Sequence, residues 1–176
     1  MNKAIYNEIL QAGCVSTAIK EKYFSGVGFM AIRDKMEEIG LDRHTPIELE
    51  STEIAVLTPF GVLMQIRPSD NDQLGTWGGV LRDGEDPAEG AMRELFEETG
   101  ICITKDDLEF VEIDEHFHEY ANGDKARFKC YRYIVRFNYV PTVTTDEESV
   151  GAVMVAHTIL HHQQEFIKRV LGEVKK

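Results

Sequence analysis

Three glutamates close together in the chain offer its clearest chemistry. Glu94, Glu97 and Glu98 are spaced so that a helix of 3.6 residues per turn places their carboxylates on one side of about one turn, where like charges repel. A divalent cation would offset that repulsion. Hard oxygen ligands favour Mg²⁺, or alternatively Mn²⁺, over zinc, and Mg²⁺ typically binds through carboxylates, waters and substrate phosphates. The cluster therefore predicts a magnesium site that acts on a phosphate compound.

Two further charged residues are placed to hold the cluster. Arg93 lies four residues before Glu97, a spacing at which helical side chains pair. Glu85 lies just before the helix, where it could also reach Arg93. The competing interpretation is a solvated acidic helix face, because charge runs on exposed helices are ordinary.

The helix that carries these residues has a marked start and end. Asp86 suits the N-cap, Pro87 the first helical position and Gly100 the stop, while Glu89 could complete a capping box. An apolar stripe recurs at the helical period and should pack on a core; its members are Ala88, Ala91, Met92, Leu95 and Thr99. The sequence thus predicts one helix with a core-facing stripe beside an acidic arc.

The stretch from Gly79 to Ile101, GVLRDGEDPAEGAMRELFEETGI, resembles the Nudix box, G-x5-E-x7-R-E-U-x-E-E-x-G-U, in which U is aliphatic. Every fixed position is filled, by Gly79, Glu85, Arg93, Glu94, Leu95, Glu97, Glu98, Gly100 and Ile101. Resemblance to Nudix hydrolases implies that Glu94, Glu97 and Glu98 bind the metal together with the carbonyl of Gly79. It also implies that Arg93 and Glu85 are an orienting pair. This match favours the metal site over the solvated face.

Two residues outside the box are expected to bind substrate. Nudix hydrolases often carry Trp-x-x-Pro-Gly-Gly before the box, whereas this chain has Trp77 at the usual proline position. Arg67 ends an expected strand where family members often carry an arginine, and it could contact a phosphate. A surface cation is the alternative for Arg67.

The general base has several candidates. In many Nudix hydrolases an acidic residue just before the last strand supplies a metal ligand or the base, and Glu148 or Glu147 has that position. Glu97 is a further candidate for the base, and Glu115 and Glu119 are rivals. An exposed acidic turn is the alternative for Glu147 and Glu148.

Length and composition indicate one globular domain with a small appendage. The chain has 176 residues, of which 43% are hydrophobic and 28% charged. It lacks an apolar run of about 18 residues and a signal-peptide pattern, so we expect a cytoplasmic protein without a membrane partner. The net charge of −12 argues against nucleic acid as a partner and leaves a small-molecule nucleotide. Three separated cysteines argue against disulfides and zinc.

The remaining chain predicts strands and helices around the box. We expect a hairpin over residues 54–67, two long strands over 108–120 and 125–137 joined by Asn122-Gly123, a strand over 150–156 and a helix over 157–171. Near the N-terminus we expect an amphipathic helix over 29–39, a shorter helix before it and a connection over 44–50. The family resemblance implies an α/β fold, a Nudix-type α/β/α sandwich with a mixed sheet.

The expected domains are an N-terminal helical extension, residues 1–48, and a Nudix hydrolase domain, residues 49–176. For the extension we favour a packing or homodimer element over a substrate-selecting role. The predicted function is Mg²⁺-dependent hydrolysis of a phosphoanhydride in a nucleoside diphosphate linked to another group, such as a nucleotide sugar or ADP-ribose. The alternatives are a pyrophosphohydrolase of nucleoside triphosphates, oxidised ones included, and a Nudix-like ligand-binding module of a regulator.

Overall fold

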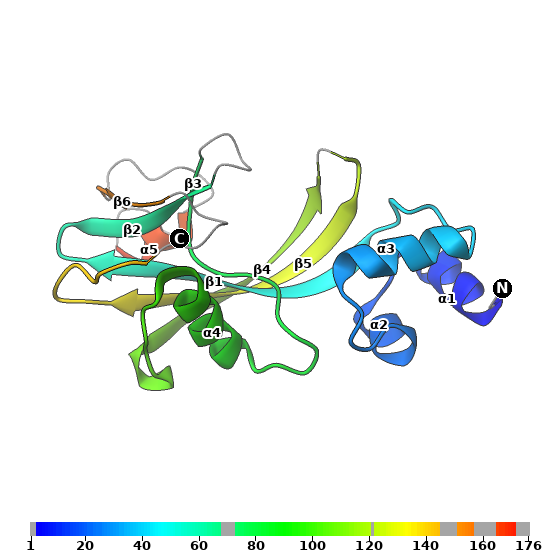
Figure 1. The fold of residues 1–176 in the computed structure, drawn as a ribbon, viewed down its shortest axis with the longest axis horizontal. Coiled ribbons are helices and arrows are strands. Elements are labelled where there is room, and N and C mark those ends of the chain that lie inside the picture. Colours follow the sequence, from blue (N-terminus) through cyan, green and yellow to red (C-terminus); the bar gives the residue numbers. More distant parts are fainter. Residues whose placement is uncertain (1–2, 68–72, 121, 145–150, 157–164, 172–176) are drawn as a thin grey trace.

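A six-stranded mixed sheet lies at the centre of the fold (Figure 1). The computed structural model describes residues 3–67, 73–120, 122–144, 151–156 and 165–171. The helices are α1 Lys3–Ala12, α2 Thr17–Tyr23, α3 Phe29–Glu38, α4 Pro87–Thr99 and α5 Glu165–Val170, with a short 3-10 turn at Lys105–Asp107. The strands are β1 Ile47–Thr58, β2 Gly61–Arg67, β3 Gln73–Gly75, β4 Leu108–Glu119, β5 Lys125–Arg136 and β6 Gly151–Val155.

Strand β1 organises the sheet. One edge of β1 pairs in parallel with β5 along its length, from Ile47 to Leu57. Its other edge is shared between β2, which forms the expected antiparallel hairpin, and the loop before α4, which bridges to β1 at Val80 and Trp77. The sheet order is β3-β2-β1-β5-β4, with β6 also paired to β2. The box loop therefore joins the sheet directly through β1.

Helices α4 and α5 cover opposite faces of this sheet. Leu95 of α4 packs in one core with Ile54, whereas Phe166 of α5 packs in another core with Ala55. Successive side chains of a strand point to opposite faces, so neighbouring residues of β1 pack against α4 on one face and against α5 on the other. The predicted α/β/α sandwich with a mixed sheet is confirmed.

The N-terminal helices gather at one end of the sheet, away from α4 (Figure 1). They form a third core with the start of β1, where Ile32 and Met36 of α3 pack with Ile47 and Leu49. The helix expected over 29–39 and the shorter one before it are confirmed, and α2 was not predicted. Among the described residues, none of the helices combines the length and apolar character needed to cross a membrane.

The connection expected over residues 44–50 is wrong, because β1 begins at Ile47. Ile47 and Leu49 are buried while Glu48 and Glu50 are half-buried, which is the alternation of a strand with one covered face. The boundary expected between residues 48 and 49 therefore falls inside β1, and the division into two domains stays a prediction.

The sequence did not predict the short strand β3. The start of the last expected helix, residues 157–164, lies outside the described residues.

A buried charge pair fastens the helical extension to the β4–β5 turn. The guanidinium of Arg33, on α3, donates to the carbonyl oxygens of Arg43, Thr45 and Lys125. Asp124 in the turn is buried, and its Oδ1 lies 3.8 Å from Nε of Arg33. Arg43 lies 3.6 Å from the same oxygen of Asp124, but it is partly exposed, so removing Arg33 would leave the buried carboxylate with weaker compensation.

Arg33→Met is therefore expected to lower the free energy of unfolding by about 3 kcal/mol. Urea unfolding followed by the fluorescence of the single tryptophan measures this change. The matched control is Arg136→Met, because Arg136 is half exposed and its pair with Glu109 is a surface pair that contributes less than about 1 kcal/mol. Equal stability of the two variants would contradict a structural role for the buried pair.

Candidate active site

Helix α4 begins and ends where the sequence predicts. The side chain of Asp86 accepts hydrogen bonds from the amides of Ala88 and Glu89 at 3.0 and 3.1 Å, and Gly100 ends the helix in the left-handed region with φ of 73°. The capping box expected with Glu89 does not form, because its carboxylate pairs with Lys105 at 3.1 Å. Both ends of α4, the helix that carries the acidic turn, are thus fixed by local interactions.

The loop before α4 lies flat against β1. The amide of Thr52 donates to the carbonyl of Gly79 at 2.9 Å, and the amide of Leu81 donates to the carbonyl of Glu50 at 2.9 Å. At Gly78, where φ is 140°, a Cβ would lie 2.1 Å from the carbonyl oxygen of Thr52. Only glycine permits this approach, which brings Gly79 beside the acidic turn of α4.

Arg93 joins the loop to the helix through three carboxylates. Its Nε and Nη2 donate to the two oxygens of Glu85 at 2.7 and 2.8 Å, a bidentate pair. Its Nη1 donates to Glu94 at 2.6 Å and to Glu97 at 3.0 Å. The hydrogen bonds from Arg93 lower the pKa of Glu85 to about 2. Both contacts that the sequence predicts for Arg93 are present.

The three clustered glutamates differ in environment. Glu94 is largely buried, and this burial raises its pKa although Arg93 opposes the shift. Glu98 accepts a hydrogen bond from the amide of Gly78 at 2.8 Å. Glu97 is about half exposed and also pairs with Arg82 at 3.1 Å. Arginines and a backbone amide thus compensate the charges that the helix places together.

The residues fit a divalent cation in their donor chemistry. The carboxylate of Glu94 lies so close to Gly79 that a Cβ added to this glycine would be 2.7 to 2.8 Å from it. Any side chain at position 79 would therefore take up the space beside the carboxylate. Carboxylate and carbonyl oxygens are the ligands that Mg²⁺ and Mn²⁺ prefer. Within the described ranges, however, no three acidic, histidine or cysteine side chains converge tightly enough to enclose an ion. Gathering all the predicted ligands around one ion therefore requires some of these carboxylates to change rotamer.

Comparison with known proteins decides the family. The sequence model of the NUDIX domain matches residues 51–171, which is more than half of the chain. The chain belongs to the Nudix family. A MutT-like protein from Streptomyces ambofaciens is 42% identical over 66 residues, which cover 36% of this chain and 41% of that relative. The matching segment thus spans about two fifths of the relative.

Solved structures share the fold. The E. coli dihydroneopterin triphosphate pyrophosphohydrolase superposes with a TM-score of 0.58 at 17% identity, over 71% of this chain and 96% of that one. A C. elegans Ap4A hydrolase superposes with a TM-score of 0.54 at 15% identity, over 70% of this chain and 96% of that one. At these identities the likeness extends to the fold alone.

Trp77 is not a substrate contact in this Nudix structure, and that expectation is corrected. Its side chain is 1% exposed, and its ring N–H donates to the carbonyl of Leu63 at 2.9 Å. A buried indole whose only donor is satisfied inside the protein cannot stack on a nucleobase. Trp77 instead packs the loop of the Nudix box against the core that contains Ile54 and Leu95.

The remaining predicted residues fall into two groups, those outside the described part of the chain and those on β4. The side chain of Arg67, at the end of β2, lies outside the described part of the chain, as do Glu147 and Glu148. Glu115 and Glu119 are on β4, which runs along the far side of β5 from β1. Of the candidates for the general base that are described, Glu97 is the one that the structure places beside Arg93 and the other box carboxylates.

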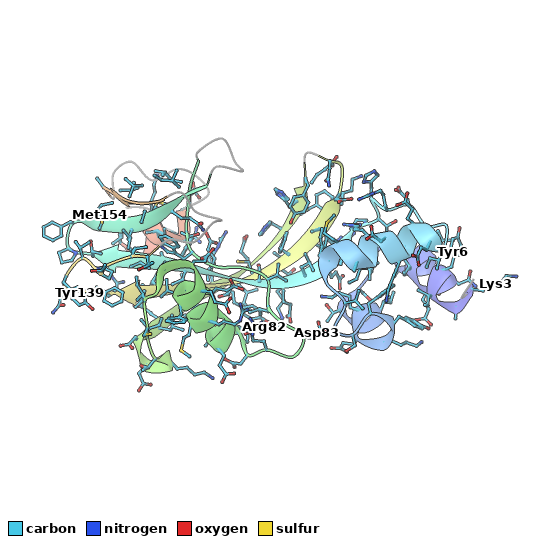
Figure 2. The ribbon with its side chains drawn as sticks, in the orientation of Figure 1. Lys3, Tyr6, Arg82, Asp83, Tyr139 and Met154 are labelled. Atoms are coloured by element: carbon cyan, nitrogen blue, oxygen red, sulfur yellow. The ribbon has the colours of Figure 1, made fainter. Side chains whose placement is uncertain are left out.

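The sequence did not indicate two charged residues at the tip of the box loop. Arg82 pairs with Glu97, and Asp83 accepts a hydrogen bond from the amide of Gly26 at 2.7 Å. Figure 2 shows Arg82 and Asp83 next to each other, between α4 and α2. Gly26 is 57 residues away in the sequence, so no local spacing could reveal this contact with the extension.

Glu85→Gln should make stability less dependent on acid pH. Because the pKa of Glu85 is about 2 in the folded protein and about 4.3 in an unfolded chain, its pairing stabilises fully above pH 5 and loses its effect as the pH falls toward 2. We expect wild type to exceed the variant by about 2 kcal/mol at pH 6, and by less at pH 3. Urea unfolding at both pH values, with Glu89→Gln as the exposed control, measures the difference. A constant advantage from pH 6 to pH 3 would be inconsistent with this pairing.

Proposed function

We propose that this chain is a metal-dependent pyrophosphohydrolase that cleaves a phosphoanhydride in a nucleoside diphosphate linked to another group, such as a nucleotide sugar or ADP-ribose. The observation that carries the proposal is the complete Nudix box in the loop and helix α4, with Glu94 against Gly79 and Arg93 bonded to three carboxylates. A pyrophosphate is a polyanion, and an acidic site can hold it only with cations between the two.

The ligands for Mg²⁺, or alternatively Mn²⁺, would be Glu94, Glu97, Glu98 and the carbonyl oxygen of Gly79. The bound ion supplies charge neutralisation at the bridging phosphates and a lower pKa for the attacking water. Arg93 keeps Glu94 and Glu97 in place, and Glu85 holds the other edge of its guanidinium. Such outer contacts orient metal ligands and support their affinity.

Glu97 is our first candidate for the group that accepts the proton of the attacking water. Its side chain is 48% exposed, whereas Glu94 is largely buried and Glu98 is held by the amide of Gly78. Glu97 is therefore the carboxylate of the cluster that water reaches most easily. Glu148 is the alternative, and Arg67 remains our candidate for a contact with a substrate phosphate.

Hydrolysis of nucleoside triphosphates is a second candidate. The shared fold of the E. coli dihydroneopterin triphosphate pyrophosphohydrolase, whose name specifies a triphosphate, is the reason to consider it. A regulatory module that only binds its ligand is less well supported, because binding alone does not require the three crowded carboxylates with their arginine.

The substrate class can be tested with one panel. The protein is incubated with Mg²⁺ and, separately, with nucleotide sugars, ADP-ribose, a dinucleoside polyphosphate and nucleoside triphosphates, and released phosphate and mononucleotide are measured. We expect mononucleotide release from the linked diphosphates and its loss with EDTA. Faster turnover of triphosphates would select the second candidate, and no turnover anywhere would contradict an enzymatic function.

Glu97→Gln and Glu98→Gln should each lower kcat about 100-fold or more, because each removes a negative oxygen ligand and, for Glu97, the proposed base. The fold should be retained, since neither carboxylate packs in a core. Steady-state kinetics at saturating Mg²⁺ and circular dichroism measure the two properties. Glu89→Gln, on the same helix but outside the cluster, is the control. Full activity in either cluster variant would refute these roles.

Gly79→Ala should weaken metal binding by about tenfold, because the new methyl group would displace the carboxylate of Glu94 from the adjoining carbonyl. Calorimetric titration with Mn²⁺ in the absence of substrate measures this affinity. Gly28→Ala is a matched control, since an added Cβ there meets no atom within 4 Å. Equal Mn²⁺ affinity in wild type and Gly79→Ala would show that Gly79 lies outside the metal site.

A further inference from the structure

A cleft of about 640 Å³ lies where the N-terminal extension meets the sheet, and the reaction proposed above does not use it. Its lining residues come from four elements: Thr17 at the start of α2, Glu48 and Glu50 of β1, Phe117 of β4, and Arg127 and Lys129 of β5. This volume is within the range of small-molecule sites. The extension therefore forms one wall of a cavity that the sheet alone would leave open.

The cleft lies farther along β1 than the contacts of that strand with the box loop. Glu48 and Glu50 share a face of β1 with Thr52 and Ile54, the face on which α4 packs. Thr52 donates to the carbonyl of Gly79, so Glu50 and Glu48 lie about 7 and 13 Å farther along the strand. The carbonyl of Glu50 also accepts the amide of Leu81. A group attached to a pyrophosphate at Gly79 can therefore reach this cleft.

Several polar side chains of the cleft have partners among the described residues, whereas Arg127 and Glu115 have no hydrogen bond or ion pair there. Glu50 accepts hydrogen bonds from Lys129 at 3.2 Å and from Tyr131 at 3.1 Å. The carboxylate of Glu48 accepts the amide of Thr17 at 3.0 Å. Over the described portion of the chain, the exposed side chain of Arg127 has neither an ion pair nor a hydrogen bond. It is therefore available to a ligand.

An exposed aromatic ring lies beside this free guanidinium. Phe117 is directly opposite Arg127 in the pairing of β4 with β5, and its side chain is 53% exposed. Directly opposed residues of an antiparallel pair have Cβ atoms about 5 Å apart. Ring and guanidinium can therefore contact the same ligand, the ring through its flat face and Arg127 through hydrogen bonds.

The charge of the cleft disfavours a second phosphate. Glu48, Glu50 and Glu115 bring three negative charges to its lining, against the two positive charges of Arg127 and Lys129. The balance suits a neutral group that has hydrogen-bond donors for carboxylates, acceptors for a guanidinium and a flat apolar face. A nucleoside has all three, in its ribose hydroxyls, the acceptor atoms of its base and the base plane.

We infer that this cleft binds the nucleoside part of the substrate, with Phe117 stacking on the base and Arg127 donating to its acceptor atoms. The inference rests on the proposed function for its link to turnover. The N-terminal extension then takes part in substrate selection, because α2 contributes Thr17 to the wall and holds Glu48 in place.

Binding of nucleosides tests the cleft without requiring turnover. Adenosine, guanosine, uridine and cytidine are titrated separately into wild type, Phe117→Ala and Arg127→Gln, with binding followed by ligand-observed NMR. We expect wild type to bind at least one nucleoside and each variant to bind it about tenfold more weakly. Phe110→Ala and Arg136→Gln are the controls, since both side chains are about half exposed on the same two strands but outside the cleft. Absence of binding by all four nucleosides, or equal binding by wild type and both cleft variants, would overturn the inference.

Kinetics then separate this inference from the proposed reaction. With the best substrate of the panel, Phe117→Ala and Arg127→Gln should raise KM about tenfold while kcat stays within about threefold of wild type. If the panel shows no turnover but the nucleoside titration succeeds, the proposed reaction fails and the binding site stands. If turnover is normal and KM is unchanged in both variants, the cleft has no part in substrate binding.

Discussion

The whole site depends on compensating negative charge along one turn of α4. Glu94, Glu97 and Glu98 repel one another on that turn, and Arg93 offsets this repulsion at Glu94 and Glu97. Arg93 can do so because Glu85 holds the other edge of its guanidinium from the loop. The same arginine thus balances the helix and fastens the loop that contains Gly79. The position of this loop relative to α4 therefore depends on the rest of the fold.

Strand β1 holds the box loop in place through backbone hydrogen bonds. Its edge binds the box loop at Thr52 and Glu50, while its alternating side chains enter the α4 layer, the α5 layer and the core of the extension. A further contact, from Gly26 to Asp83, joins the extension to the loop tip. The helical extension is therefore linked to the site both through the sheet and directly.

How much the sequence predicts depends on how local each interaction is. The ends of α4, its apolar stripe and the pairs of Arg93 all lie within a short stretch, and each is present apart from the capping box. By contrast, burial of Trp77 depends on β1 and β2, which close over it from other parts of the chain. The start of β1 was missed because its outward positions are glutamates, and its pairing partner, β5, is 79 residues away. The cleft around Phe117 and Arg127 required three strands and α2 to be assembled, which no spacing could show.

The long parallel pairing of β1 with β5 also bears on how the protein folds. Ile47 meets Ala126, so this pairing must close a loop of 79 residues before it gains any contact energy. Contacts of such separation form slowly compared with helices and hairpins. The turn of α4 can form early from its own caps, but the box loop gains its support only after β1 is in register. A slip of one residue would turn Ile47 and Leu49 toward the cleft and Glu48 and Glu50 toward the helical core. We therefore expect the box loop to reach its final position only when β1 and β5 have paired in the correct register.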